Sequence, residues 1–136
     1  MRYMLMMNAP RKGWESLAGW PPEDFKAHIA FMLQLNKDLT ASGELVSAEG
    51  LDMPAEARIV TATKGGPAVT DGPFPETKEF LAGFWIVDVE STERAVAIAG
   101  RVSSAPGPGG QSLNIPVELR QVMCGPPPLD EADASR

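Results

Sequence analysis

The chain has 136 residues, 43% of them hydrophobic, and a formal net charge of −6 at pH 7. This length suits one domain, and a chain of this size buries enough surface to fold without disulfides or metal. The acidic balance and the scattered basic residues argue against nucleic acid or an anionic membrane surface as a partner.

A lone cysteine, Cys124, excludes an internal disulfide, and a lone histidine, His28, argues against a zinc site. The glycine motifs that bind phosphates and dinucleotides are missing, so we expect neither a metal nor another cofactor. The sequence has no run of ~18 apolar residues, so we expect no membrane span. The first residues lack the features of a signal peptide. The cytoplasm is therefore the expected location.

Apolar periodicity and turn residues predict an alternation of strands and helices. Pro21-Pro22-Glu23-Asp24 predicts a helix start, because proline fits the first turn and carboxylates suit the positive end of the helix dipole. Gly43 predicts where that helix ends, and Ser91 is a predicted N-cap for a second helix. In chain order we expect a strand at residues 2–8, a helix from Pro21 to about residue 42, a strand at 44–51, a hairpin with strands at 58–63 and 67–70 around Lys64-Gly65-Gly66, a strand at 80–89, a helix from Ser91 and a strand at 113–123.

Without the hairpin, this order is that of a ferredoxin-like split βαβ sheet with both helices on one face, so the fold class is α+β with an inserted β-hairpin. The first and third main strands, which would be central, are apolar on both faces. In residues 80–89 the faces carry Leu81, Trp85 and Val87 against Phe84 and Ile86. Helices cover only one side of such a sheet, so we expect two subunits to pack sheet to sheet as a homodimer. One domain is expected over residues 1–124, followed by a disordered, proline-rich and then acidic tail at 125–136.

Asp71 is the first candidate for a functional residue. It begins the stiff turn Asp71-Gly72-Pro73, whose residue types are also those of a purely structural turn. The functional alternative is that this turn holds the Asp71 carboxylate at the mouth of a cavity, where a catalytic group must stay in place.

His28 lies at the edge of the apolar stripe predicted for the first helix. It is either a hydrogen-bonded core residue or, if it faces a pocket, the leading general acid or base. Asn36 projects toward the same side and either lines that cavity or bonds to backbone.

Four further residues are candidates for substrate binding. Lys78 and Arg120 would hold an anionic group of a small molecule, although ordinary ion pairs with Glu76 and Glu118 explain them as well. Glu49 ends the second main strand. Trp85 would wall a pocket for a flat or apolar ligand, with core packing as the alternative.

The central motif also resembles a known family. The residues Asp71-Gly72-Pro73-Phe74, Glu76, Lys78-Glu79 and Gly83-Phe84 resemble the signature of DGPF-type proteins within the YCII-related family. Tyr3-Met4-Leu5-Met6, Glu49-Gly50-Leu51 and Glu118-Leu119-Arg120 fit the same pattern, and the likeness runs from about residue 2 to 123. The resemblance implies a ferredoxin-like subunit that pairs as a dimeric α/β barrel.

For function, the resemblance implies two classes. Some YCII-like relatives are enzymes that use a histidine, on the first helix, and an aspartate on small acidic substrates, including chlorinated muconate-type compounds. By this analogy His28 and Asp71 would exchange protons in a cofactor-independent enzyme of lyase or dehalogenase type. The DGPF subgroup is also associated with extracytoplasmic-function sigma factors, which implies instead a non-catalytic, dimeric binding or accessory protein.

Overall fold

A computed structural model describes residues 1–11, 19–72 and 78–123 of the chain. The expectations for Cys124, for the tail at 125–136 and for positions 73–77 of the central motif lie outside these residues. The described elements are β1 (Arg2–Pro10), α2 (Pro22–Ala41), β2 (Leu45–Gly50), a short 3-10 helix η2 (Pro54–Glu56), β3 (Arg58–Thr63), β4 (Gly66–Asp71), β5 (Glu79–Asp88), α3 (Thr92–Ser103), a second 3-10 helix η3 (Pro108–Gly110) and β6 (Val117–Gln121).

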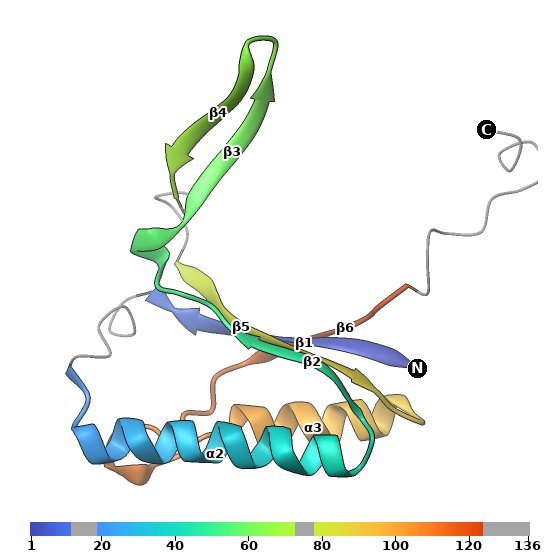
Figure 1. Cartoon of the computed structure of the whole chain (residues 1–136). Helices are drawn as coiled ribbons and strands as arrows, with labels where there is room; N and C mark the ends of the chain where they lie inside the picture. Colours follow the sequence, from blue (N-terminus) through green and yellow to red (C-terminus); the bar gives the residue numbers. More distant parts are fainter. Residues whose placement is uncertain (12–18, 73–77, 124–136) are drawn as a thin grey trace, which may run out of the picture.

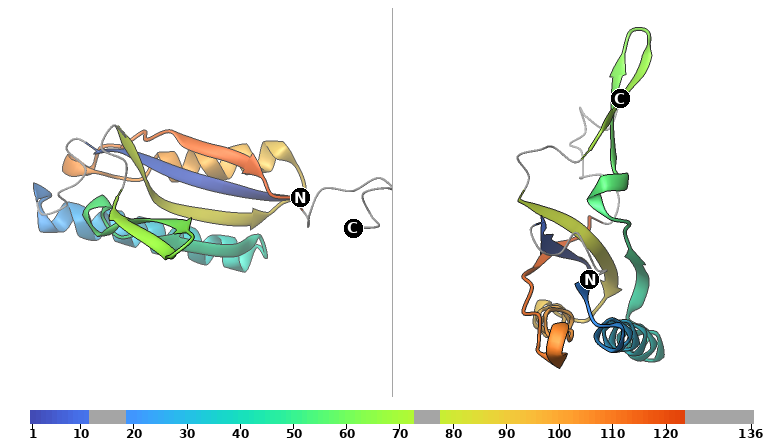
Figure 2. Two further views of the ribbon diagram at one scale, coloured as in Figure 1. Left: turned by 90° about the horizontal axis from the view of Figure 1, so that it is seen from above. Right: turned by 90° about the vertical axis from the view of Figure 1, so that its left-hand side faces the viewer.

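Four of the strands form an antiparallel sheet in the order β2-β5-β1-β6. Both helices lie on one face of this sheet, α2 under the β2 side and α3 under the β6 side (Figures 1 and 2). This is the ferredoxin-like α+β arrangement, and it confirms that the first and third main strands, β1 and β5, are central.

The helix boundaries follow from their flanking residues. Pro22 opens α2, with Glu23 and Asp24 in its first turn, and the helix ends at Ala41 because Gly43 takes a φ of +78°. At α3, the Ser91 hydroxyl accepts a hydrogen bond from the backbone N–H of Arg94 at 3.1 Å. The predicted N-cap is therefore confirmed.

The core lies between the sheet and the helices. Leu5 and Val87 of the central strands, Leu35 of α2 and Val102 of α3 are each completely buried. Each such side chain contributes about 1.5–3 kcal/mol relative to an exposed position. Cross-strand register places Leu5 opposite both Trp85 and Leu119, so these three share the helix-facing side.

A β-bulge corrects one prediction about the faces of β5. The register of β1 and β5 shifts after Met7, which pairs with Gly83, so that Asn8 pairs with Leu81 and Ala82 is the extra residue. Leu81 was predicted on the same face as Trp85, and this is wrong. The inserted residue reverses the alternation and puts Phe80, which is buried, on the helix side instead.

The last strand is shorter than predicted. It was expected over 113–123, but β6 covers only Val117–Gln121. Pro116 has no N–H to give to a ladder, and Asn114 takes a positive φ of 52°, which breaks the extended backbone.

The hairpin β3–β4 stands apart from the main sheet and projects from the side opposite to the helices (Figure 1). Its base is closed by the N–H of Gly72, which donates to the Ala57 carbonyl at 2.9 Å. A Cβ at position 72 would lie only 2.8 Å from Cγ1 of Ile59. Gly72 of the central motif is therefore explained by close packing at the foot of this arm.

Candidate binding pocket

A pocket of about 330 Å³ lies between α2 and the β2–β5 side of the sheet. One wall is a face of α2, and the other is formed by the end of β2, the residues that follow it and the bulged part of β5. The lining residues are Met7, Phe25, His28, Ile29, Met32, Leu33, Asn36, Ala48, Glu49, Gly50, Leu51, Met53, Ala82, Gly83 and Trp85. Most of these side chains are apolar, which is usual for a small-molecule site.

The helical wall carries its two polar side chains in one row. His28, Met32 and Asn36 follow each other at intervals of four residues, and such residues lie on the same face of a helix. With a rise of 1.5 Å per residue, the row extends over about 12 Å. The pocket is therefore an elongated space with a polar group toward each end.

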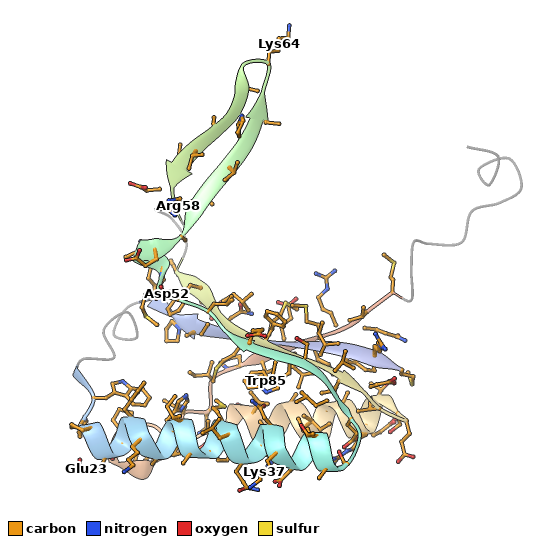
Figure 3. All side chains as sticks on the ribbon, viewed as in Figure 1. Glu23, Lys37, Asp52, Arg58, Lys64 and Trp85 are labelled. Atoms are coloured by element: carbon orange, nitrogen blue, oxygen red, sulfur yellow. The ribbon has the colours of Figure 1, made fainter. Side chains whose placement is uncertain are left out.

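Asn36 is tied to the opposite wall. The indole Nε1 of Trp85 donates a hydrogen bond to Oδ1 of Asn36 at 2.9 Å. Trp85 is only 6% exposed, whereas Asn36 is half-buried. Figure 3 shows Trp85 on the helix side of the sheet, above α2. A buried indole N–H usually finds an acceptor, and here that acceptor belongs to the pocket.

His28 is held by the loop that follows α3. Its Nδ1 lies 3.0 Å from the carbonyl oxygen of Pro106, and the ring of Trp20 packs edge-on against the imidazole, with 5.6 Å between ring centroids. A carbonyl oxygen only accepts, so Nδ1 carries the hydrogen, and Nε2 is the basic nitrogen of the neutral ring. The neighbouring Asp24 also binds this loop, because its Oδ2 accepts from the N–H of Gly109 at 2.9 Å.

The mouth of the pocket is unusually apolar for a surface. Phe25, Ile29 and Leu33 of α2 are 37%, 41% and 64% exposed, and Leu51 after β2 is 41% exposed. These four residues all line the pocket. A contiguous apolar patch of this kind marks a ligand or partner site more often than an ordinary surface.

The residues predicted for a site fall into two groups. His28, Glu49 and Trp85 line this pocket, as does Asn36, whereas Asp71, Lys78 and Arg120 do not. Glu49 pairs in register with Phe84, so its side chain is directed to the sheet face that the helices leave open. Asp71 ends β4 opposite Arg58 at the foot of the arm, on the other side of the sheet from α2 (Figures 1 and 3). His28 and Asp71 therefore do not line this pocket together within one subunit.

Lys78 and Arg120 occupy other positions. The Lys78 carbonyl accepts from the backbone N–H of Arg11 at 2.8 Å, just before β5. Arg120 pairs in register with Met4 and so lies on the sheet face that the helices leave open.

The hydrogen bond between Asn36 and Trp85 was not predicted from the sequence. A tryptophan in a buried strand needs an acceptor for its N–H, which was the available signal, but nothing in the sequence names that partner.

A bidentate ion pair between α3 and the residue before β2 lies away from the pocket. Arg94 of α3 donates from Nε and Nη2 to the two carboxylate oxygens of Glu44, both at 2.8 Å. These hydrogen bonds lower the pKa of Glu44 from 4.5 to about 2. The bond from Arg101 similarly holds the pKa of Asp38 below its usual value, and it joins α3 to α2. Both pairs are structural, because they connect helices and strand rather than facing the cavity.

Residues 1–11, 19–72 and 78–123 contain no group of three or more His, Cys, Asp or Glu side chains placed to hold a metal ion. Neither of the helices in this part of the chain is both long and apolar enough to cross a membrane.

The fold and the pocket together define a ferredoxin-like α+β protein with a small-molecule-sized cavity between its first helix and the sheet edge. The family model of the YCII-related domain matches residues 1–107, and the chain belongs to this family. It is also similar to an uncharacterised protein of Rhizobium meliloti (strain 1021), with 28% identity over 88 residues, which cover 65% of this chain and 71% of that protein.

Proposed function

We propose that the protein binds a small, largely apolar molecule in the pocket between α2 and the β2–β5 side of the sheet. The observation that carries this proposal is the composition of the cavity. Among the described residues that line it, the polar side chains on the helix side of the sheet are those of His28 and Asn36, besides the indole N–H of Trp85. A few polar groups in an apolar cavity are typical of sites that orient a ligand while burying most of its surface.

A screen of small molecules by thermal shift tests this proposal, because a bound ligand raises the melting temperature in proportion to the logarithm of its concentration over its Kd. Ile29→Glu would place a charge at the mouth of the pocket and should abolish the shift given by the hits. Ala30→Glu is the matched control, since Ala30 is the next residue on α2, is exposed and does not line the pocket. The assignment of the site would be refuted if both variants lost the thermal shift equally, or if the compounds still shifted the melting temperature of Ile29→Glu.

Acid-base catalysis by His28 is a second candidate function, in the same pocket and without a cofactor. It is favoured by the bond to the Pro106 carbonyl, which leaves Nε2 as the basic nitrogen of the neutral ring. Lyase or dehalogenase chemistry that relies on a pair of His28 and Asp71 finds no support within one subunit. Any turnover of a bound compound, followed by mass spectrometry, should vanish in His28→Gln while binding persists. Turnover that survives in His28→Gln would rule out this role.

We also propose that the sheet face left open by the helices packs against a second copy of the chain, and that the protein belongs to the DGPF-type subgroup. Met4 and Met6 of β1 pair in register with Ile86 and Phe84 of β5, and all four are only half-buried in one subunit. The flanking β6 presents Glu118 and Arg120 on the same face. An apolar centre with a charged rim is the usual anatomy of a protein interface.

The oligomeric state tests this second proposal. We expect a dimer by light scattering at micromolar concentration, and a monomer for Met6→Glu, which buries an unpaired charge in the proposed interface. Ala30→Glu adds the same charge to the outer side of α2 and should remain dimeric. A monomeric unmodified protein would contradict the proposed pairing but would leave the pocket untouched.

A further inference from the structure

We propose that the pocket selects molecules with a neutral oxygen acceptor, such as the carbonyl of a ketone, ester or amide, which Asn36 binds through its amide N–H groups. Asn36 then acts as a specificity residue, and Trp85 acts as its positioning residue. This inference rests on the proposed function, since it concerns the ligand of the same pocket.

The argument begins with the orientation of the Asn36 amide. An indole Nε1 carries a hydrogen and has no acceptor lone pair, so Trp85 can only donate. The amide atom that meets Nε1 at 2.9 Å must therefore be Oδ1. The reversed orientation would bring two donors together, which is unfavourable. The ambiguity that usually affects an asparagine amide is removed here by the chemistry of its partner.

The fixed orientation leaves the other half of the amide for a ligand. Nδ2 of Asn36 carries two N–H groups and donates to no acceptor among the described residues, while Asn36 itself lines the pocket. We infer that these N–H groups face the pocket, where only water or a ligand that offers an acceptor satisfies them. A ligand without an acceptor would leave these N–H groups unpaired, which costs affinity.

The charges around the cavity favour a neutral acceptor over a carboxylate. The described lining residues include no lysine and no arginine. His28 is the only described lining residue that can carry a positive charge, and it is two helical turns from Asn36, or about 12 Å. Burying an anion without a nearby cation is costly, so a carboxylate head is disfavoured at Asn36.

The shape of the space completes the description of the ligand class. Met32 separates His28 from Asn36 along α2, and the facing wall is made of small residues of the bulged strand, Ala82 and Gly83. An elongated molecule with an apolar body and a carbonyl group at the Asn36 end matches this arrangement.

Three compounds of similar length test the inference by NMR titration: benzylacetone, a ketone; phenylbutyrate, a carboxylate; and butylbenzene, a hydrocarbon. We expect benzylacetone to bind roughly fivefold more tightly than either of the others, which is the gain from one net hydrogen bond. Only benzylacetone should shift the side-chain NH₂ resonances of Asn36. Asn36→Asp, which replaces the donors by an acceptor of the same shape, should abolish the preference for the ketone.

Trp85→Phe separates the positioning role from simple packing. It retains an aromatic ring but removes the N–H that fixes the amide, so the ketone preference should fall by about half while butylbenzene binds as before. Equal binding of ketone and hydrocarbon to the unmodified protein would overturn the inference and leave the pocket in place. Failure of all three compounds to bind, or binding that persists in Ile29→Glu, would instead remove the proposed pocket and the inference with it.

Discussion

The two helices lie on the same face of one sheet, yet they pack differently. In α3 the inward residues Ala95, Ile98 and Val102 are all buried, and the helix is capped by Ser91. In α2 only Leu35 and Leu39 of the second half are buried.

The part of α2 up to Leu33 carries large apolar residues that remain exposed, namely Phe25, Ile29 and Leu33. It also has no side-chain cap at Pro21. The difference shows that an apolar stripe on a helix does not by itself indicate core. The apolar stripe of α3 packs in the core, whereas half of the apolar stripe of α2 borders a cavity.

A pair of isoleucines gives the largest expected effect. Ile98 of α3 is 2% exposed and Ile29 of α2 is 41% exposed. Ile98→Ala should lower the free energy of unfolding by about 3 kcal/mol, because it removes buried methyl groups and leaves a void. Ile29→Ala should cost less than about 1 kcal/mol. Urea denaturation measures both, and similar losses would mean that α2 is as firmly packed as α3.

The cap of α3 comes next. Ser91→Ala removes the acceptor for the Arg94 N–H and should destabilise the protein by about 1 kcal/mol. Ser91→Asp keeps an acceptor at the same place and should retain stability. If both variants were equally destabilised in thermal unfolding, the hydroxyl would matter through something other than capping.

The Glu44–Arg94 pair connects α3 to the start of β2 and predicts a dependence on pH. The pKa of Glu44 is lowered from 4.5 to about 2 in the folded protein, so its contribution is complete above pH 4.5 and disappears as the pH falls toward 2. Because Arg94 is partly exposed, we expect about 1 kcal/mol rather than the full value of the shift. Glu44→Gln should remove this step from a plot of stability against pH, and an unchanged plot would contradict the assignment.

The smallest expected effect concerns the N-terminus of α2. Pro21→Ser supplies a side-chain acceptor at the N-cap and should add about 0.5 kcal/mol. Amide hydrogen exchange should slow in the first turns of α2 and stay the same in α3. Slower exchange in both helices would show that they open together and would weaken the contrast between them.

The sequence was sufficient for the fold because its local signals agree with one another. Helix starts, the Gly43 stop, the Ser91 cap and the apolar central strands are short-range features, and all were found where expected. The bulge at Ala82 was not predictable, since an extra residue in a strand is defined by its partner strand. The reversed position of Leu81 follows from that one residue.

The candidate site was only partly predictable for a similar reason. His28, Glu49 and Trp85 were named and line one cavity, and periodicity places the side chains of His28 and Trp85 on the faces that border it. Asp71 was named with them, but the inserted hairpin carries it to the other side of the sheet. A motif indicates that residues act together, whereas the direction in which an inserted arm leaves the sheet is a long-range property.

The loop after α3 has a consequence for the size of the pocket. It ties down the loosely packed half of α2 at two points, through the Pro106 carbonyl to His28 and through the Gly109 N–H to Asp24. Pro106 is 78 positions after His28 in the sequence, and Gly109 is 85 positions after Asp24. Lengthening or shortening this tether would let the helix tilt outward or draw it in. The volume of the cavity could thus be changed to suit larger or smaller ligands without altering any residue that contacts them.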